Sequence, residues 1–106
     1  MSTDAASAHP TEVSNGASKS AMESYSHAAA AELRKYGITV NIIAPGPIQT
    51  GYIPADVEAE LATRIPLGRI GTPDDVADAT VLLASEQARW ITGQKIYVGG
   101  GNKMPL

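Results

Sequence analysis

The sequence predicts an α/β protein in which parallel strands are joined by helices. The run from Ile38 to Ala44, ITVNIIA, is β-branched and mostly apolar without strict alternation, as in strands that are covered on both faces. The clearest helix start lies at Thr72-Pro73, and a second short strand is predicted from Lys95 to Val98. The order helix, strand, two helices, strand is typical of α/β layers with right-handed crossovers.

The composition fits one small domain and excludes several functions. The chain has 106 residues, 43% of them hydrophobic, with no Phe, so its core is expected to consist mainly of Ala, Val, Leu and Ile. A net charge of −3 and the absence of a Lys/Arg cluster argue against nucleic acid as a partner. There is no Cys, and His9 and His27 lie too far apart for a local ligand pair, so no metal is expected.

No segment is predicted to enter a membrane. The sequence contains no run of eighteen apolar residues and no charged-then-apolar leader. We therefore expect a protein that stays in the cytoplasm and has no membrane partner.

The first helix is predicted from a capping-box pattern. Residues 1–14 are small and polar and indicate a loop or the remnant of a strand end. The pattern S-x-x-E from Ser20 to Glu23 then predicts a helix start, and Gly37 predicts the stop. The expected apolar face, in which Tyr25 is a core residue, is Met22, Tyr25, Ala29 and Leu33.

The later elements follow from proline, glycine and apolar spacing. Pro45-Gly46-Pro47 ends the first strand, and a short amphipathic helix is predicted from about Pro54 to Arg64. The helix after Thr72 runs through Ser85, with carboxylates in its first turn. Its expected buried stripe is Val76, Ala79, Val81, Leu82 and Leu83.

Two parallel strands do not make a stable sheet on their own. The ITVNIIA strand would keep an apolar, unpaired edge unless a third strand covers it. We therefore expect the chain to be part of a larger sheet, completed by a missing segment or by another copy of itself.

Four segments together resemble a known family. They are GASKSAMESYSHAAAAEL, RKYGITVNIIAPGPIQT, IPLGRIGTPDDVADATVLLAS and ITGQKIYVGGG, and in this order and spacing they resemble the C-terminal half of a short-chain dehydrogenase/reductase, similar to the 3-oxoacyl-acyl-carrier-protein reductase type. The resemblance implies that residues 15–106 form the last strands and helices of a Rossmann-type, doubly wound parallel sheet. It also implies NAD(P) as cofactor.

The resemblance implies a set of site residues. The family's catalytic serine falls on Ser2, its proton-transferring tyrosine on Asn15, and its lysine, which also binds the nicotinamide ribose, on Lys19. An amide does not exchange protons near neutral pH, so Asn15 could orient a carbonyl but could not replace the tyrosine. Further cofactor contacts are implied for Pro45, Gly46, Ile48 and Thr50.

Two functions remain open from the sequence. The chain contains no glycine-rich phosphate turn after a strand, and Gly99 replaces the Asp that the family usually has before its final glycine pair. One hypothesis is a truncated NAD(P)-dependent oxidoreductase of carbonyl/alcohol substrates that is inactive alone. The other is a non-catalytic interaction or dimerisation module that docks on itself or on an intact family member.

Overall fold

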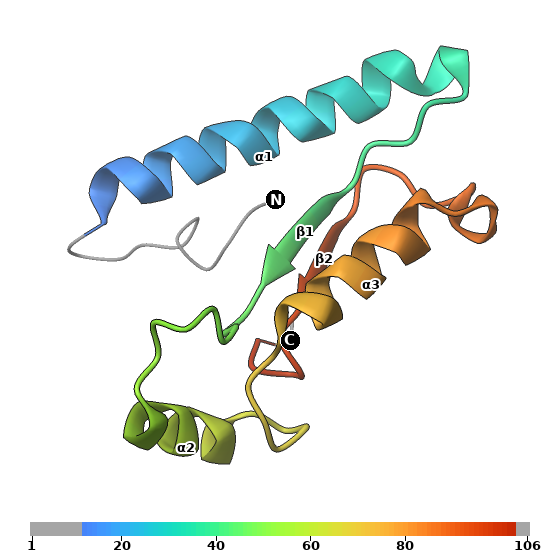
Figure 1. Ribbon diagram of the computed structural model, residues 1–106. Coiled ribbons are helices and arrows are strands. Elements are labelled where there is room, and N and C mark those ends of the chain that lie inside the picture. Colours follow the sequence, from blue (N-terminus) through green and yellow to red (C-terminus); the bar gives the residue numbers. More distant parts are fainter. Residues whose placement is uncertain (1–11, 104–106) are drawn as a thin grey trace.

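The protein has two parallel strands between helices, which confirms the predicted α/β class. A computed structural model describes residues 12–103 and is shown in Figure 1. The elements, in chain order, are helix α1 (Val13–Leu33), the 3₁₀ turn η2 (Arg34–Tyr36), strand β1 (Ile42–Pro45), helix α2 (Ala55–Arg64), helix α3 (Pro73–Ala84), the 3₁₀ turn η3 (Glu86–Ala88) and strand β2 (Lys95–Val98).

The two strands pair in parallel over four residues each. The register runs from Ile42 opposite Lys95 to Pro45 opposite Val98. The ladder is extended at both ends, because Ile42 N donates to Gln94 O at 2.8 Å and Gly46 N donates to Val98 O at 3.0 Å. This ladder brings together two segments that are far apart in the sequence.

Helices α1 and α3 lie on either side of the strands, and α2 lies beyond their carboxyl ends (Figure 1). The described core is small and built from Ala and Ile, whereas the composition predicted Val and Leu in it as well. It comprises Ala30, Ile42, Ile43, Ala44, Ile65, Ile70 and Ala88.

A partly buried ion pair joins α1 to β2. Lys95 Nζ lies 2.7 Å from Glu23 Oε1, and the two side chains are 23% and 18% exposed. Burial alone lowers the pKa of Lys95, but the hydrogen bond and charge of Glu23 outweigh it, so the pKa is raised. The pair therefore fixes the helix over this face of the sheet in the charged state.

The predicted start of the first helix is wrong. Helix α1 begins at Val13, so Ser20 lies two turns inside it and the S-x-x-E pattern does not mark the N-terminus. The pattern specifies a start only when the preceding residues cannot be helical. Residues 13–19 contain no proline, and a helix tolerates a single glycine such as Gly16 at a cost of about 1 kcal/mol.

The first strand is shorter than predicted and shifted along the chain. Ile38 to Asn41 precede β1 and do not belong to it. Val40 bonds instead to the turn before β2, donating to Thr92 Oγ1 at 3.0 Å and accepting from Gly93 N at 2.7 Å. Asn41 is a satisfied polar group, because its Nδ2 donates to Ile91 O and its Oδ1 accepts from Gln94 N.

Three residues predicted to be core are exposed. Tyr25 is 78% exposed on α1, and Val81 and Leu82 are 69% and 63% exposed on α3. An apolar pattern predicts burial only where another element covers that face, and residues 12–103 provide none there. The prediction was therefore wrong for this chain taken alone.

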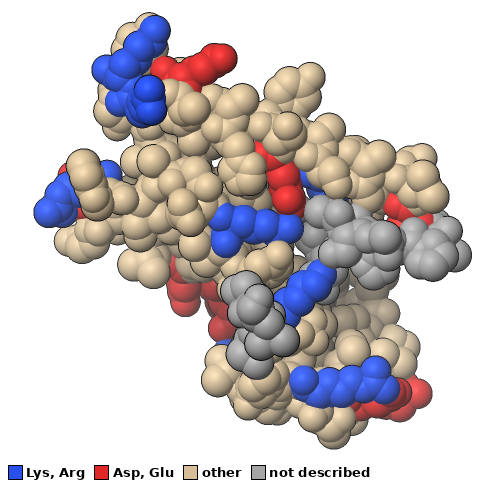
Figure 2. Space-filling view, turned by 180° about the vertical axis from the view of Figure 1, so that it is seen from behind, with Lys and Arg blue, Asp and Glu red and all other residues tan. Residues whose placement is uncertain are grey.

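Charged side chains are scattered over the surface. On the face in Figure 2, basic and acidic side chains stand in small separate groups with broad uncharged areas between them. Among residues 12–103, no helix combines the length and apolar character needed to cross a bilayer.

The Lys95–Glu23 pair leads to a prediction about stability. We expect Glu23→Gln to lower the free energy of unfolding by about 2 kcal/mol at pH 7, since a charge-assisted hydrogen bond is lost. A raised lysine pKa contributes stability below its unfolded value of about 10.4, and this contribution is lost as the pH rises through the folded value. The difference between wild type and Glu23→Gln should therefore shrink above about pH 10.4 in denaturant titrations.

The control is Glu60→Gln, which breaks the exposed Glu60–Arg64 pair within α2. Glu60→Gln should lower the free energy of unfolding by no more than about 0.5 kcal/mol. A Glu23→Gln effect as small as that of Glu60→Gln would contradict a structural role for the pair.

Candidate functional site

Two glycines bring the ends of the strands into backbone contact. A Cβ on Gly46 would stand 2.9 Å from Gly99 Cα, and a Cβ on Gly99 would stand 3.2 Å from Gly46 Cα. Neither glycine has a positive φ, so space and not backbone conformation favours glycine here. A side chain at either glycine would therefore meet backbone at a crowded position.

The loop after β1 is paired to the segment before α3. Gly71 N donates to Pro47 O and Gln49 N donates to Gly71 O, both at 2.9 Å, which makes a parallel bridge between Ile48 and Gly71. In such a bridge the bonds come from the residues on either side, so the N–H and C=O of Ile48 itself point away from Gly71. Ile48 can thus offer a peptide donor and acceptor to a ligand.

Gln49 shapes the next turn of the loop. Its Nε2 donates to Ile53 O at 3.0 Å and to Glu58 Oε2 at 2.7 Å, and its Oε1 accepts from Gly51 N at 2.9 Å. Thr50 lies within this turn and is exposed. The loop therefore holds Thr50 at the surface between two anchored residues.

An arginine–aspartate ion pair flanks Gly71, the residue to which this loop is bridged. Arg69 Nη1 and Nη2 donate to the two carboxylate oxygens of Asp75 at 2.7 and 2.9 Å. The hydrogen bond from Arg69 holds the pKa of Asp75 well below its usual range, and the Thr72 N–H adds to the shift. Both side chains are consequently charged at neutral pH.

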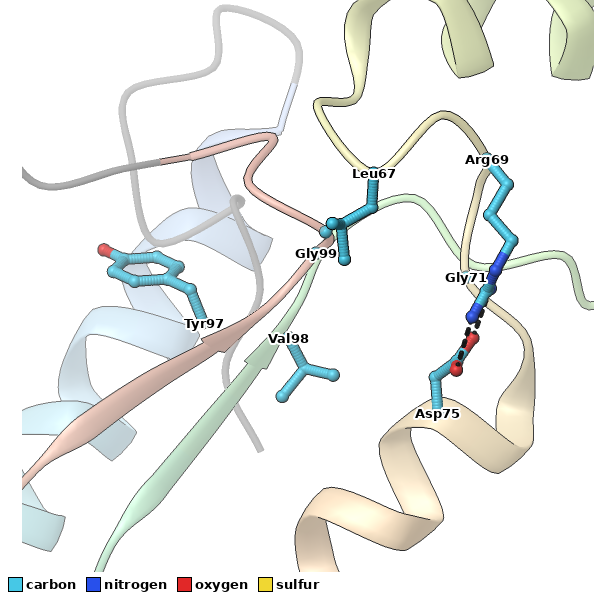
Figure 3. A pocket seen from close by; sticks show the side chains of 8 residues that line it. Leu67, Arg69, Gly71, Asp75, Tyr97, Val98 and Gly99 are labelled. Carbon is cyan, nitrogen blue, oxygen red and sulfur yellow. Dashed lines mark hydrogen bonds and ion pairs between the residues drawn. The ribbon is translucent and has the colours of Figure 1, made fainter.

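The pair borders a pocket of about 290 Å³ at the carboxyl end of β2. Figure 3 shows Arg69 and Asp75 facing each other on one side, with Tyr97 and Val98 directed to opposite faces of the strand. Gly71 and Gly99 line the same pocket. The pocket therefore adjoins the loop after β1 through Gly71, which is bridged to Ile48.

The residues matched to the family's catalytic group lie on α1. Asn15 is exposed in the first turn, and Lys19 is half-buried one turn later on the same helix face. Asn15 Nδ2 lies 3.5 Å from Glu12 Oε2, and Ser18 Oγ donates to Asn15 O, so its described hydrogen bonds stay within the helix region. Ser2 lies outside the described residues.

The structure collects most of the implied cofactor residues in one loop. Pro45, Gly46, Ile48 and Thr50 follow one another at the carboxyl end of β1. Helix α1 runs opposite to β1, so its first turns lie toward the same end of the molecule (Figure 1). No group of three or more His, Cys, Asp or Glu that could hold a metal occurs within residues 12–103.

Sequence reasoning missed Gln49, Arg69 and Gly71. Asp75, the partner of Arg69, did have a local signal in the sequence, because the T-x-x-D spacing that begins at Thr72 predicts a capping box, which the structure contains. Gln49, Arg69 and Gly71 make their contacts from loops to other segments. The residue spacing of helices and strands does not predict such contacts.

Comparisons with known proteins agree with this geometry. The sequence profile of the family described as Enoyl-(Acyl carrier protein) reductase matches residues 1–103. An uncharacterized oxidoreductase of Bacillus subtilis, YjdA, is 41% identical over 92 residues, which are 87% of this chain and 37% of YjdA. The 3-oxoacyl-acyl-carrier-protein reductase FabG of Staphylococcus aureus is 38% identical over 99 residues, which are 91% of this chain and 40% of FabG.

A solved structure shows the same arrangement. The promiscuous reductase LugOII, described as catalysing keto-reduction at C1 during lugdunomycin biosynthesis, matches with a TM-score of 0.84 at 31% identity. The match covers 95% of this chain and 42% of that protein. The chain therefore spans well under half the length of the relatives it matches.

The parallel strands, the flanking helices and the loop at the strand ends define part of a Rossmann-type oxidoreductase fold. Together with the profile match over residues 1–103, they show that the chain belongs to the short-chain dehydrogenase/reductase family.

The glycine contact leads to a prediction about stability. We expect Gly46→Ala to lower the free energy of unfolding by about 1–3 kcal/mol, because the new Cβ meets Gly99 backbone that cannot turn aside. Gly99→Ala should cost less, because its Cβ would stand 3.2 Å from Gly46 Cα, a contact that is tight but less severe than 2.9 Å. Thermal melts followed by circular dichroism at one protein concentration test the order, and equal melting temperatures for the two variants would contradict it.

Proposed function

We propose that the chain provides the nicotinamide-binding end of a short-chain dehydrogenase/reductase and takes part in NAD(P)-dependent carbonyl/alcohol hydride transfer only when the rest of the family's domain is supplied. The observation that carries the proposal is the Pro47–Thr50 loop, anchored at the carboxyl end of a parallel strand. Open α/β sheets bind their ligands at this edge.

The described residues fit the nicotinamide end of the cofactor. The outward N–H and C=O of Ile48 suit the carboxamide, and the exposed hydroxyl of Thr50 is available to the amide or the phosphates. Lys19 would donate to the ribose hydroxyls. These residues would hold a nicotinamide, which would supply or accept the hydride when bound.

Asn15 restricts proton transfer by this chain. A tyrosine has a pKa near 10, and a lysine one helical turn away favours its charged form, which allows proton exchange nearer to neutral pH. An asparagine at this position donates and accepts hydrogen bonds but transfers no proton. We therefore propose that Asn15 orients a carbonyl and that the chain as it stands has no efficient acid.

The exposed apolar residues support a requirement for further protein. Tyr25, Val81 and Leu82 occupy positions that the sequence pattern assigned to a core. Their cover would come from the remaining part of a family domain, of which residues 15–106 are the C-terminal portion, or from a second copy. Contiguous exposed apolar residues of this kind often mark contact sites with other protein.

A non-catalytic role is the second candidate. The same exposed side chains and Asn15 favour a module that docks on itself or on an intact family member without turning over substrate. The two candidates differ in one property, because only the first requires binding of a dinucleotide.

Cofactor binding separates the candidates. The full chain is titrated with NADH and NADPH while the fluorescence of the reduced nicotinamide is recorded, alone and with the N-terminal part of S. aureus FabG added. We expect saturable binding at least in the mixture, and a weaker affinity by about tenfold for Lys19→Ala, which loses a charge-assisted hydrogen bond. A folded sample without saturable binding in either condition favours the interaction module.

The role of Asn15 is tested by restoring the hydroxyl. In the same mixture, with a 3-oxoacyl thioester as the carbonyl substrate, we expect Asn15→Tyr to turn over NADPH at least about 100-fold faster than wild type, the usual contribution of a general acid. Asn15→Phe is the matched control, with the ring but no hydroxyl. Equal rates for the Tyr and Phe variants would contradict this mechanism.

A further inference from the structure

Asp75 collects more hydrogen bonds than a helix cap needs. Besides the two bonds from Arg69, Asp75 Oδ2 accepts from Thr72 N at 2.7 Å and from Thr72 Oγ1 at 3.1 Å. The Thr72 bonds belong to the start of α3. The bonds to Arg69 reach back six residues and tie the segment before α3 to the helix.

Arg69 passes this restraint on to the backbone beside Gly71. Its Nη1 also donates to Ile70 O at 3.0 Å, and Ile70 is buried. The guanidinium thus bridges a fixed helix terminus and the peptide that leads into Gly71. Arginine suits this task because its planar fork keeps several donors in a rigid arrangement.

Gly71 then positions the loop. Both bonds of its bridge go to the residues that flank Ile48, and the space left by its missing side chain holds Ile48 Cδ1, which would lie 2.5 Å from a Cβ on Gly71. One continuous chain of contacts therefore leads from the Arg69–Asp75 ion pair through Ile70 and Gly71 to the Pro47–Gln49 backbone.

We propose that Arg69 and Asp75 act as a latch that holds Gly71 against the Pro47–Gln49 backbone and so positions the outward peptide groups of Ile48 for a dinucleotide. Arg69 and Asp75 are positioning residues, because they act through Gly71. The role in ligand binding rests on the proposed function, whereas the latch itself is a property of the chain alone.

The latch is tested by hydrogen exchange at two named amides. In the full chain labelled with ¹⁵N, we expect Arg69→Gln to accelerate exchange of the Gln49 and Gly71 N–H groups at least about tenfold relative to the Ile42 N–H in the β1–β2 ladder. Arg69 is the residue to change, because its loss leaves the Thr72–Asp75 cap in place. If the exchange rates of Gln49 and Gly71 relative to that of Ile42 were the same in Arg69→Gln as in wild type, the latch would be overturned.

The matched control is Arg64→Gln. Arg64 forms an ion pair with Glu60 and is 68% exposed, close to the 60% of Arg69, but it lies on α2 and belongs to an exposed pair within one helix. It should leave the Gln49 and Gly71 ratios within about twofold of wild type. An acceleration equal to that of Arg69→Gln would show a general loss of stability and would overturn a specific latch.

Ligand affinity tests the positioning role separately. Where the wild-type chain or its mixture binds NADH, Arg69→Gln should weaken binding about tenfold and Arg64→Gln should not, the change of one decade corresponding to about 1.4 kcal/mol. Unchanged affinity in Arg69→Gln despite faster amide exchange would overturn positioning. If wild type binds no NADH at all, the proposed function fails, and the exchange ratios still decide whether the latch exists.

Discussion

The rest of the structure depends on the four-residue ladder between β1 and β2. It joins the N-terminal and C-terminal parts of the described chain through backbone bonds, from Ile42 opposite Lys95 to Gly46 N, which donates to Val98 O. Because parallel strands end at the same edge, the ladder sets the loop after β1 beside the glycines that follow β2. The separate Ile48–Gly71 bridge then holds that loop beside the segment that enters α3. The close approach of Gly46 and Gly99 is a consequence of this pairing. It explains why a side chain at Gly46 is expected to lower the free energy of unfolding.

Local chemistry was enough to predict several elements. Strand β2 has the predicted bounds, since KIYV is bracketed by turn residues, and α3 starts at Pro73 after Thr72 as the cap rule requires. Helix α2 begins within one residue of its predicted start because Pro54 and Pro66 bracket it. The family resemblance drawn from the four linked segments was confirmed by the profile match and by the relatives.

The errors have physical causes of two kinds. The start of α1 and the bounds of β1 depend on what continues or pairs with the segment, which S-x-x-E and ITVNIIA do not contain. Burial of Tyr25 and Leu82 depends on neighbours beyond their own helix. The Arg69–Asp75 pair and its link through Gly71 to Ile48 span two loops, so no helix or strand period could predict them. The assignments of Ser2, Asn15 and Lys19 to a catalytic group stay predictions.

A ladder this short, with both outer edges unpaired among residues 12–103 and apolar side chains exposed on α1 and α3, supports our proposal that further protein covers these surfaces. The most direct test is sedimentation velocity of the full chain over a range of concentrations, with binding of a hydrophobic dye recorded on the same samples. We expect species heavier than the 11.0 kDa monomer at high concentration and dye binding on dilution. A monodisperse monomer that melts cooperatively and binds no dye would contradict the requirement for a covering partner.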